Sequence, residues 1–313
     1  MNGLELSRAY YEQYGEPMLR ERFPQLMPLL AAGLAGSGSE CWGYDDEISR
    51  DHDFEPGFSL FLPGEDVVDR RTAFALERAY AALPKEFMGL KRAMLAPVGG
   101  ARHGVLRTAD FFREKTGSAD GNLSLMEWLT LPEYLLAEAV NGEIFADGLG
   151  EVTAIRDRLR HRPADVRLKK LAGQLLLMGQ SGQYNYRRCL LHGETGAAQL
   201  AVAEFVKSAM AAVFLLNDIY QPYYKWSFRA MRALPRLSIT AELLEYLLTT
   251  DNEEETASEK YAVMEGIAAD IIGELQAQSL TQAVCGDLEK HAYSVNDRIS
   301  DAQIRNLHIL AAV

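Results

Sequence analysis

The pattern of apolar residues changes its character near residues 117–122 of this chain. Before that point, residues 57–62 place Phe58, Leu60 and Leu62 at alternate positions, as in a strand with one buried face. From residue 124 onward long helical patterns take over, and we identify no alternating segment there. We therefore predict an α+β chain with a small mixed sheet and its helices at residues 1–120 and an all-helical bundle at residues 121–313.

Individual elements follow from the same patterns and from proline and glycine breaks. In the first part we expect helices at residues 4–23, 66–83 and 110–115, and extended segments at residues 51–54, 57–62 and 105–108. Residues 26–34 are apolar and fit either a helix or the approach to the loop that follows. In the second part we expect helices at residues 168–179, 199–220, 241–248, 258–278 and 280–293.

Charge and composition restrict the class of protein. The 313 residues carry 32 basic and 44 acidic side chains, a net charge of -12, so no excess positive field is available to bind a long nucleic acid. Three scattered cysteines suggest neither a disulfide framework nor a zinc site. The first 19 residues include charged side chains where a secretory signal needs an apolar run, and the longest apolar runs are too short to span a bilayer. We expect a cytoplasmic protein that does not enter a membrane.

A glycine-serine segment followed by paired acids is the main candidate for chemistry. Gly36-Ser37-Gly38-Ser39 precedes Asp51-His52-Asp53, and an acidic stretch, residues 45–47, lies between them. If residues 50–54 are extended, Asp51 and Asp53 project to the same face and can share a hard divalent cation, while His52 faces the other way as a packing residue. Taken alone, a glycine-serine cluster is typical of surface turns, and we interpret residues 45–47 as a solvated loop.

This combination resembles a known superfamily. The segments G-S-G-S-E-C-W-G-Y-D-D-E-I-S-R-D-H-D, Q-S-G-Q-Y-N-Y-R-R and F-L-L-N-D-I-Y-Q-P-Y-Y-K-W are similar to DUF4037, a bacterial domain of unknown function within the DNA polymerase beta-like nucleotidyltransferases. The resemblance covers residues 36–237, and the layout looks like that of antibiotic nucleotidyltransferases. It implies that Gly36, Ser37 and Ser39 cradle ATP or another nucleoside triphosphate, and that Asp51 and Asp53 bind Mg²⁺.

One part of the superfamily pattern is missing. Many members bring a third carboxylate from a later strand, but the strand expected at residues 105–108 carries Leu106 instead. Asp110 follows that strand, and antibiotic nucleotidyltransferases sometimes take their general base from the helical domain, where Glu194 and Glu204 are available. The sequence does not choose between these three acids and a site without a third acid.

The helical part contributes further candidates. Asn185 and Arg188 lie in a polar cluster after Gly182, and Lys225 lies among aromatic residues where proline breaks a helix. We interpret them as contacts to the triphosphate or to the acceptor, although surface residues and a bundle end cap fit the same patterns. Trp226 is expected in the core.

Three functions remain open at this level. The first is a Mg²⁺-dependent enzyme that moves a nucleoside monophosphate to a hydroxyl of a small molecule or a protein. The second is a catalytically weak nucleotide-binding module of a regulatory or antitoxin-like kind. The presence of Leu106 on the strand where many superfamily members carry the third acid favours this function. The third is a purely helical interaction protein whose first part is a scaffold.

Overall fold

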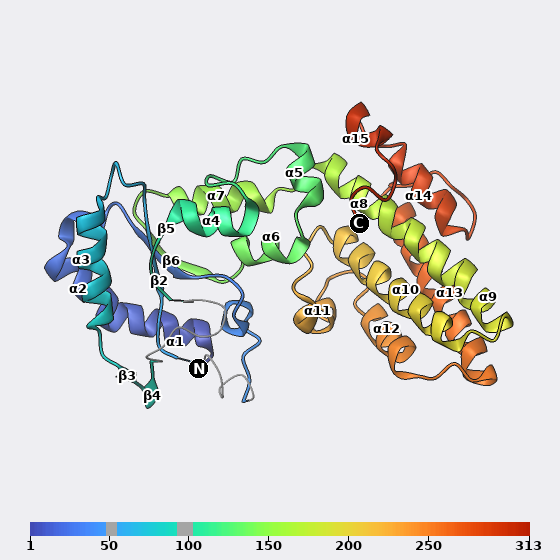
Figure 1. Cartoon of the computed structure of the whole chain (residues 1–313), viewed down its shortest axis with the longest axis horizontal. Helices are drawn as coiled ribbons and strands as arrows, with labels where there is room; N and C mark the ends of the chain where they lie inside the picture. The colour runs from blue at the N-terminus through green and yellow to red at the C-terminus, as the bar shows by residue number, and fades with distance from the viewer. Residues whose placement is uncertain (48–54, 93–102) are drawn as a thin grey trace. The chain divides into compact units, whose positions relative to one another are not determined.

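The chain forms two compact units, each with its own apolar core, in the computed structural model, which describes residues 1–47, 55–92 and 103–313 (Figure 1). The sheet unit comprises Met1–Leu123 and Leu135–His161, and the helical unit comprises Ser124–Tyr134 and Arg162–Val313. The units are therefore not continuous in sequence. Residues 135–161, which follow the first segment of the helical unit, belong to the sheet unit.

A four-stranded mixed sheet organises the sheet unit, in the order β5-β2-β1-β6. β1 is antiparallel to both β2 and β6, whereas β2 is parallel to β5. The predicted strands at residues 57–62 and 105–108 are confirmed, and residues 26–34 supply a central strand rather than a helix. The bounds are β1 (Ala31–Leu34), β2 (Ser59–Leu62), β5 (Gly104–Arg107) and β6 (Glu143–Asp147).

The expectation that no strand follows residue 124 is wrong, because β6 lies at Glu143–Asp147. It is paired on one side only, with β1, and its residues are half-buried or exposed. An edge strand of five residues need not show a clean alternation of apolar and polar positions, because neither face is fully covered. This is why the periodicity of the sequence gave no signal there.

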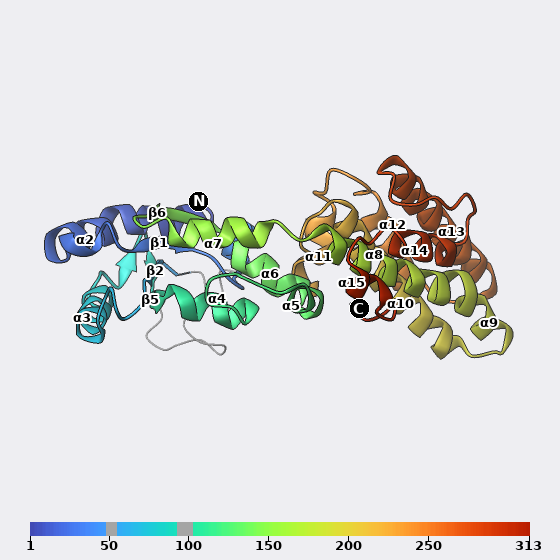
Figure 2. The same cartoon turned by 90° about the horizontal axis from the view of Figure 1, so that it is seen from above.

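Helices cover both faces of the sheet, as Figures 1 and 2 show for α2 and α3 on one side and α4 and α7 on the other. Phe58, Leu60 and Leu62 belong to one apolar cluster with residues of α1, α2 and α3. Phe61 faces the other way and meets Phe111 of α4, with ring centroids 5.3 Å apart. The alternation at residues 57–62 thus predicted the buried face of Phe58, Leu60 and Leu62 correctly, but it did not predict that the other face, with Ser59 and Phe61, is buried as well. Helices cover both faces of the sheet, so both faces of this strand are buried.

The helix predicted at residues 4–23 is α1 (Gly3–Tyr10), a π-helical turn (Tyr11–Gly15) and α2 (Glu16–Arg22). Those at residues 66–83 and 110–115 are α3 (Arg70–Ala81) and α4 (Thr108–Thr116). This unit also contains 3₁₀ turns at Pro24–Leu26 and Ser39–Trp42, the hairpin of β3 (Glu86–Phe87) and β4 (Leu90–Lys91), and the helix α7 (Glu151–Arg160). The helix α6 (Glu133–Val140) begins in the helical unit and ends in the sheet unit.

The helical unit packs around α8 and α10, which contact each other and share one core. The predicted helices are confirmed in kind, but α8, α10 and α13 each begin four residues earlier than predicted, and the helix expected at residues 280–293 begins only at Leu288. Their bounds are α8 (Ala164–Met178), α10 (Thr195–Leu216), α12 (Thr240–Thr249), α13 (Glu254–Ala277) and α14 (Leu288–Asn296). Further helices are α5 (Leu125–Thr130), α9 (Tyr186–Leu191), α11 (Tyr224–Met231) and α15 (Ala302–Asn306), and a π-helical segment, η5 (Gly179–Asn185), joins α8 to α9.

The helix α10 is long and apolar enough to cross a membrane by length and composition, which the short apolar runs of the sequence did not suggest. In the helical unit, however, 61% of its most apolar window is buried. The core helix of a soluble protein passes the same test, so this feature is weak support for a membrane span.

Candidate functional site

The paired acids of the sequence pattern cannot be placed. Asp51, His52 and Asp53 lie outside the residues that the structure describes, so the predicted metal ligands remain a prediction. Of the predicted site, the structure places the glycine-serine segment, residues 36–39, and the side chains that hold it.

The glycine-serine segment, residues 36–39, directly follows the buried central strand β1. Gly36 has a φ of 129°, a conformation that strongly favours glycine, and among the described residues, its two chain neighbours aside, no atom lies within 4 Å of the position that a Cβ would occupy. Ser37 is exposed and Ser39 is half-buried at the start of a 3₁₀ turn. Within this segment Gly36 and Gly38 are buried, and Ser37 is the exposed residue.

The side chain of Asn141 fixes the start of this segment with two hydrogen bonds. Its Oδ1 accepts from the Gly36 N–H at 2.9 Å, and its Nδ2 donates to the Gly36 carbonyl at 2.7 Å. The Gly36 amide is thus already paired within the protein, and it would have to leave Asn141 before donating to a phosphate. Ser37 and Ser39, the other two predicted phosphate contacts, lie beyond this clamp on the same segment.

A buried arginine holds Asn141 in turn. The Nη2 of Arg156 donates to the carbonyls of Val140 at 2.9 Å and of Asn141 at 2.7 Å, at the end of α6. Its side chain is buried, and this burial lowers the pKa of the guanidinium to about 10. A cation at the C-terminal end of a helix is favourable, and here it also brings a positive charge close to the residue that clamps Gly36.

Two acidic residues close to the glycine-serine segment make contacts within the protein. The carboxylate of Glu40 is buried and lies against Gly38. Asp45, predicted in a solvated loop, instead accepts a hydrogen bond at 2.8 Å from the N–H of Gly3, in the first turn of α1. A carboxylate at that end of a helix is favourable because it faces unpaired amides, so Asp45 helps to hold α1 in place.

The three candidates for a third carboxylate lie in different places. On β5, Leu106 pairs in register with Phe61, and Asp110 is exposed on α4, where it forms an ion pair with Arg113 at 2.8 Å. Glu194 is exposed at the start of α10, and Glu204 lies 3.8 Å from Lys207 on the same helix. No group of three or more His, Cys, Asp or Glu side chains that could hold a metal occurs among the described residues.

The predicted contacts in the helical unit are not brought together. Asn185 and Arg188 are exposed, and the Arg188 guanidinium lies 5.0 Å from the ring centre of Tyr184. Lys225 is exposed and lies 4.8 Å from the ring centre of Trp226, which is half-buried rather than fully in the core. The 22 residues of α10 separate the two groups in sequence, a helix about 33 Å long, and Figure 1 shows α9 and α11 near opposite ends of it. One small ligand within this unit cannot touch both.

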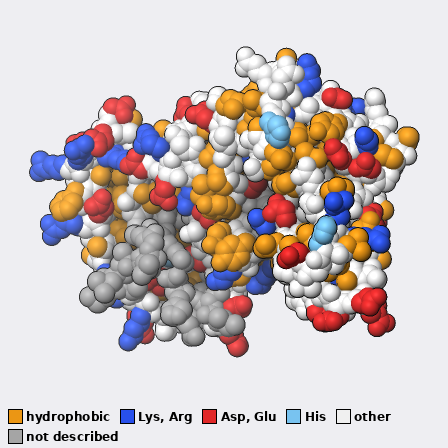
Figure 3. All heavy atoms as spheres, turned by 45° about the vertical axis from the view of Figure 1, so that its right-hand side comes forward, with side chains coloured by type: hydrophobic (Ala, Val, Ile, Leu, Met, Phe, Trp, Pro, Cys, Tyr) orange, Lys and Arg blue, Asp and Glu red, His pale blue; other side chains and the backbone are white. Residues whose placement is uncertain are grey.

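Charges of both signs are mixed on the one face of the molecule that Figure 3 draws. Acidic and basic side chains are interspersed on the face drawn in Figure 3, within the part of it that is coloured by residue type. Such a face offers no continuous basic path for a long nucleic acid.

Comparison with known proteins gives one family. Residues 128–227 match the family described as "Domain of unknown function (DUF4037)", as the resemblance of the sequence segments predicted. None of the curated proteins matches the chain. The matched range runs from the second half of α5 to the first half of α11, and it does not include the glycine-serine segment.

Proposed function

With residues 128–227 identified as a DUF4037 domain, we propose that this chain is a Mg²⁺-dependent nucleotidyltransferase that moves a nucleoside monophosphate from ATP or another nucleoside triphosphate to a hydroxyl group. One observation carries the proposal: the glycine-serine segment leaves a buried strand, is fixed by Asn141 at its first glycine, and exposes Ser37. A pre-organised turn of this kind can present its remaining backbone amides and hydroxyls to phosphate oxygens.

The residues of the sheet unit have distinct tasks in this proposal. Ser37 and Ser39 donate to phosphate oxygens, and Asn141 keeps the turn in its binding shape. Arg156 contributes a positive potential from beneath the turn without touching the ligand, because its guanidinium is buried. Asp51 and Asp53 would hold the ion through carboxylate oxygens, the donor type that Mg²⁺ prefers, and a bound Mg²⁺ neutralises charge on the phosphates.

The reaction is a substitution at the α-phosphorus. The acceptor oxygen forms a bond to that phosphorus, the bond to the leaving pyrophosphate breaks, and the acceptor proton passes to a base or to water. Leu106 means that β5 does not supply a third acid. The acceptor is a small molecule or a protein, since the net charge of -12 disfavours a long polynucleotide, and we place the enzyme in the cytoplasm.

The direct test uses the full chain, Mg²⁺ and a triphosphate labelled at the α-phosphorus, with a panel of hydroxyl-bearing acceptors that includes aminoglycosides and proteins. We expect label on an acceptor together with pyrophosphate. Replacing Asp51→Asn and Asp53→Asn together should lower the rate more than about 100-fold, since several kcal/mol of charge stabilisation are lost. The exposed pair Glu65→Gln and Asp66→Asn is the matched control and should leave the rate unchanged. Activity that survives the loss of Asp51 and Asp53 rejects the proposal.

A second function, a catalytically weak nucleotide-binding module, is favoured by Leu106 and by the pairing of the Gly36 amide. It predicts that a triphosphate with Mg²⁺ raises the melting temperature while no acceptor becomes labelled. Sustained release of pyrophosphate excludes this function.

A further inference from the structure

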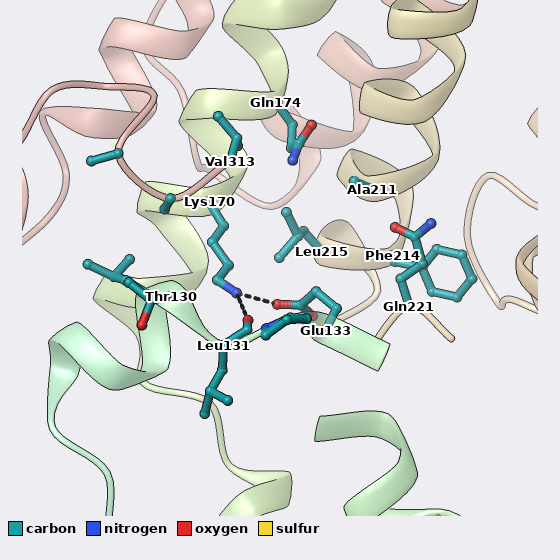
Figure 4. A pocket seen from close by; sticks show the side chains of 14 residues that line it. Thr130, Leu131, Glu133, Lys170, Gln174, Ala211, Phe214, Leu215, Gln221 and Val313 are labelled. Carbon is teal, nitrogen blue, oxygen red and sulfur yellow. Dashed lines mark hydrogen bonds and ion pairs between the residues drawn. The ribbon is translucent and has the colours of Figure 1, made fainter. Parts of the chain in front are cut away.

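A pocket of 380 Å³ lies inside the helical unit, between the end of α5, the start of α6, α8 and α10 (Figure 4). Its volume falls within the range of about 300–1,000 Å³ that is usual for small-molecule sites. All of its lining residues except Ala311, Ala312 and Val313 belong to the DUF4037 range. Eleven of the 14 lining residues thus lie in the matched range.

A buried lysine provides the charged centre of this pocket. The ammonium of Lys170 donates to the carbonyl of Leu131 at 2.9 Å and to the carboxylate of Glu133 at 2.8 Å, and Figure 4 shows it extended toward both. The Lys170 side chain is only 6% exposed. Because an ammonium has three donors and two are used here, one N–H remains for a further acceptor.

The charges around Lys170 do not cancel. The second oxygen of Glu133 accepts from Arg162 at 2.6 Å, and the Arg162 side chain is 1% exposed, so two buried cations share one carboxylate. Arg167, half-buried nearby, donates to the carbonyls of Leu215 and Leu216. Its only ion pair among the described residues is to the half-exposed Asp218 at 3.9 Å. The charged side chains that line the pocket are those of Lys170 and Glu133, and Arg162 and Arg167 lie outside its lining. Because Lys170 and Arg162 share the one carboxylate of Glu133, one buried positive charge beside the pocket has no carboxylate of its own among the ion pairs of the described residues.

The rest of the wall is suited to a partly apolar ligand. Leu131, Phe214 and Leu215 contribute apolar surface, while the amides of Gln174 and Gln221 can donate and accept. An excess buried cation is costly unless a negative charge compensates it, and hydrogen bonds to a charged partner are the strong ones. A neutral ligand would leave that excess in place, whereas an anion would remove it.

We propose that this pocket binds a small organic acid, a carboxylate or a phosphate ester, whose anionic group accepts from Lys170 and whose apolar body lies against Phe214 and Leu215. The site is built from the helical unit alone. It is thus independent of the proposed nucleotidyl transfer, and binding can be measured without nucleotide or Mg²⁺.

The test is isothermal calorimetry on the full chain with three probes of similar shape: hexanoate, hexyl phosphate and neutral hexanamide. We expect at least one anion to bind with a Kd at least tenfold lower than that of hexanamide. The tighter of the two anions identifies the anionic group, carboxylate or phosphate. If neither anion binds at concentrations up to about 10 mM, or if hexanamide binds as tightly, the proposal is wrong.

Two variants separate binding in this pocket from binding elsewhere. Lys170→Gln should remove the preference for anions, whereas Lys207→Gln, the same change on an exposed lysine of α10, should preserve it. Since Lys170→Gln also breaks an ion pair and could impair folding, Ala211→Phe provides a second measurement. It fills the pocket from α10 and leaves every charged contact in place. Anion binding that persists in a folded Ala211→Phe variant overturns the proposal.

Discussion

At the scale of single residues, Asn141 is the side chain that gives the glycine-serine segment its shape. It lies 105 positions from Gly36 in sequence and yet makes both hydrogen bonds to the Gly36 backbone. Replacing Asn141→Ala leaves a donor and an acceptor without their partner, which costs roughly 1–3 kcal/mol of unfolding free energy where the groups stay buried. Denaturant titration of the full chain measures that loss.

Two further variants make the Asn141 prediction specific. Asn141→Asp keeps the acceptor for the Gly36 N–H but sets a carboxylate oxygen against the Gly36 carbonyl, so it should also destabilise the protein. Asn306→Ala, which removes an exposed amide, should change the unfolding free energy by less than about 0.5 kcal/mol. If Asn141→Ala proves as harmless as Asn306→Ala, the clamp does not stabilise the turn.

At the scale of elements, the π-helical segment η5 depends on a glycine. A Cβ at Gly182 would overlap the ring of Phe205, which is fully buried in α10. Gly182→Ala gains about 1 kcal/mol of helix propensity but overpacks a filled core, which typically costs 1–3 kcal/mol and occasionally more. We therefore expect a net loss of stability, measured as a lower melting temperature.

A matched glycine should behave in the opposite way. Gly266 is exposed within α13, and in the described part of the chain no atom beyond its own neighbours and helix backbone lies within 4 Å of its potential Cβ. Gly266→Ala should therefore stabilise the protein by roughly 0.5–1 kcal/mol. Equal effects of the two substitutions would mean that contact with Phe205 does not decide the choice of glycine at residue 182.

The elements also show what the sequence could predict. Strand β2 and helices α8, α10 and α13 have strong periodicity because each buries a continuous apolar surface. The late start of α14 was missed because side chains hold residues 281–287 in a non-helical form: the Thr281 hydroxyl and the Cys285 carbonyl bond the two ring nitrogens of His291. Asp287 accepts from the N–H of Glu289, and an aspartate in this N-cap position indicates the start of a helix in the sequence.

The candidate site was predictable only in part for a related reason. Local composition identified residues 36–39 as a turn, because glycine and serine favour turns wherever they cluster. The role of Asn141 depends on a pairing between β1 and β6 that no local pattern announces, although Asn141-Gly142 is itself a turn signal. The pocket at Lys170 was missed because its residues come from helices far apart in sequence.

At the scale of the whole molecule, the two units have separate cores, and each contains a buried tyrosine that makes the protein sensitive to alkali. Burial raises the pKa of Tyr80 in the sheet unit and of Tyr186 in the helical unit to about 12, above the ordinary value of 10.0. The unfolded chain therefore releases these protons first as the pH rises. The contribution of these two tyrosines to stability is constant below about pH 10 and is lost between about pH 10 and 12, by about 1.4 kcal/mol per pH unit for Tyr80.

Because the cores are separate, we expect calorimetry to resolve two unfolding transitions. Asn141→Ala should lower the transition of the sheet unit, and Gly182→Ala should lower that of the helical unit. Tyr80→Phe loses the hydroxyl that donates to the Phe58 carbonyl at 2.7 Å. Tyr80→Phe should lower the midpoint temperature of the sheet unit's transition at neutral pH and make it fall less steeply with pH above about 10. Tyr186→Phe should do the same to the transition of the helical unit. A single transition that both tyrosine variants shift equally would show that the two cores unfold together. A slope that neither variant changes would assign the alkaline sensitivity to other groups.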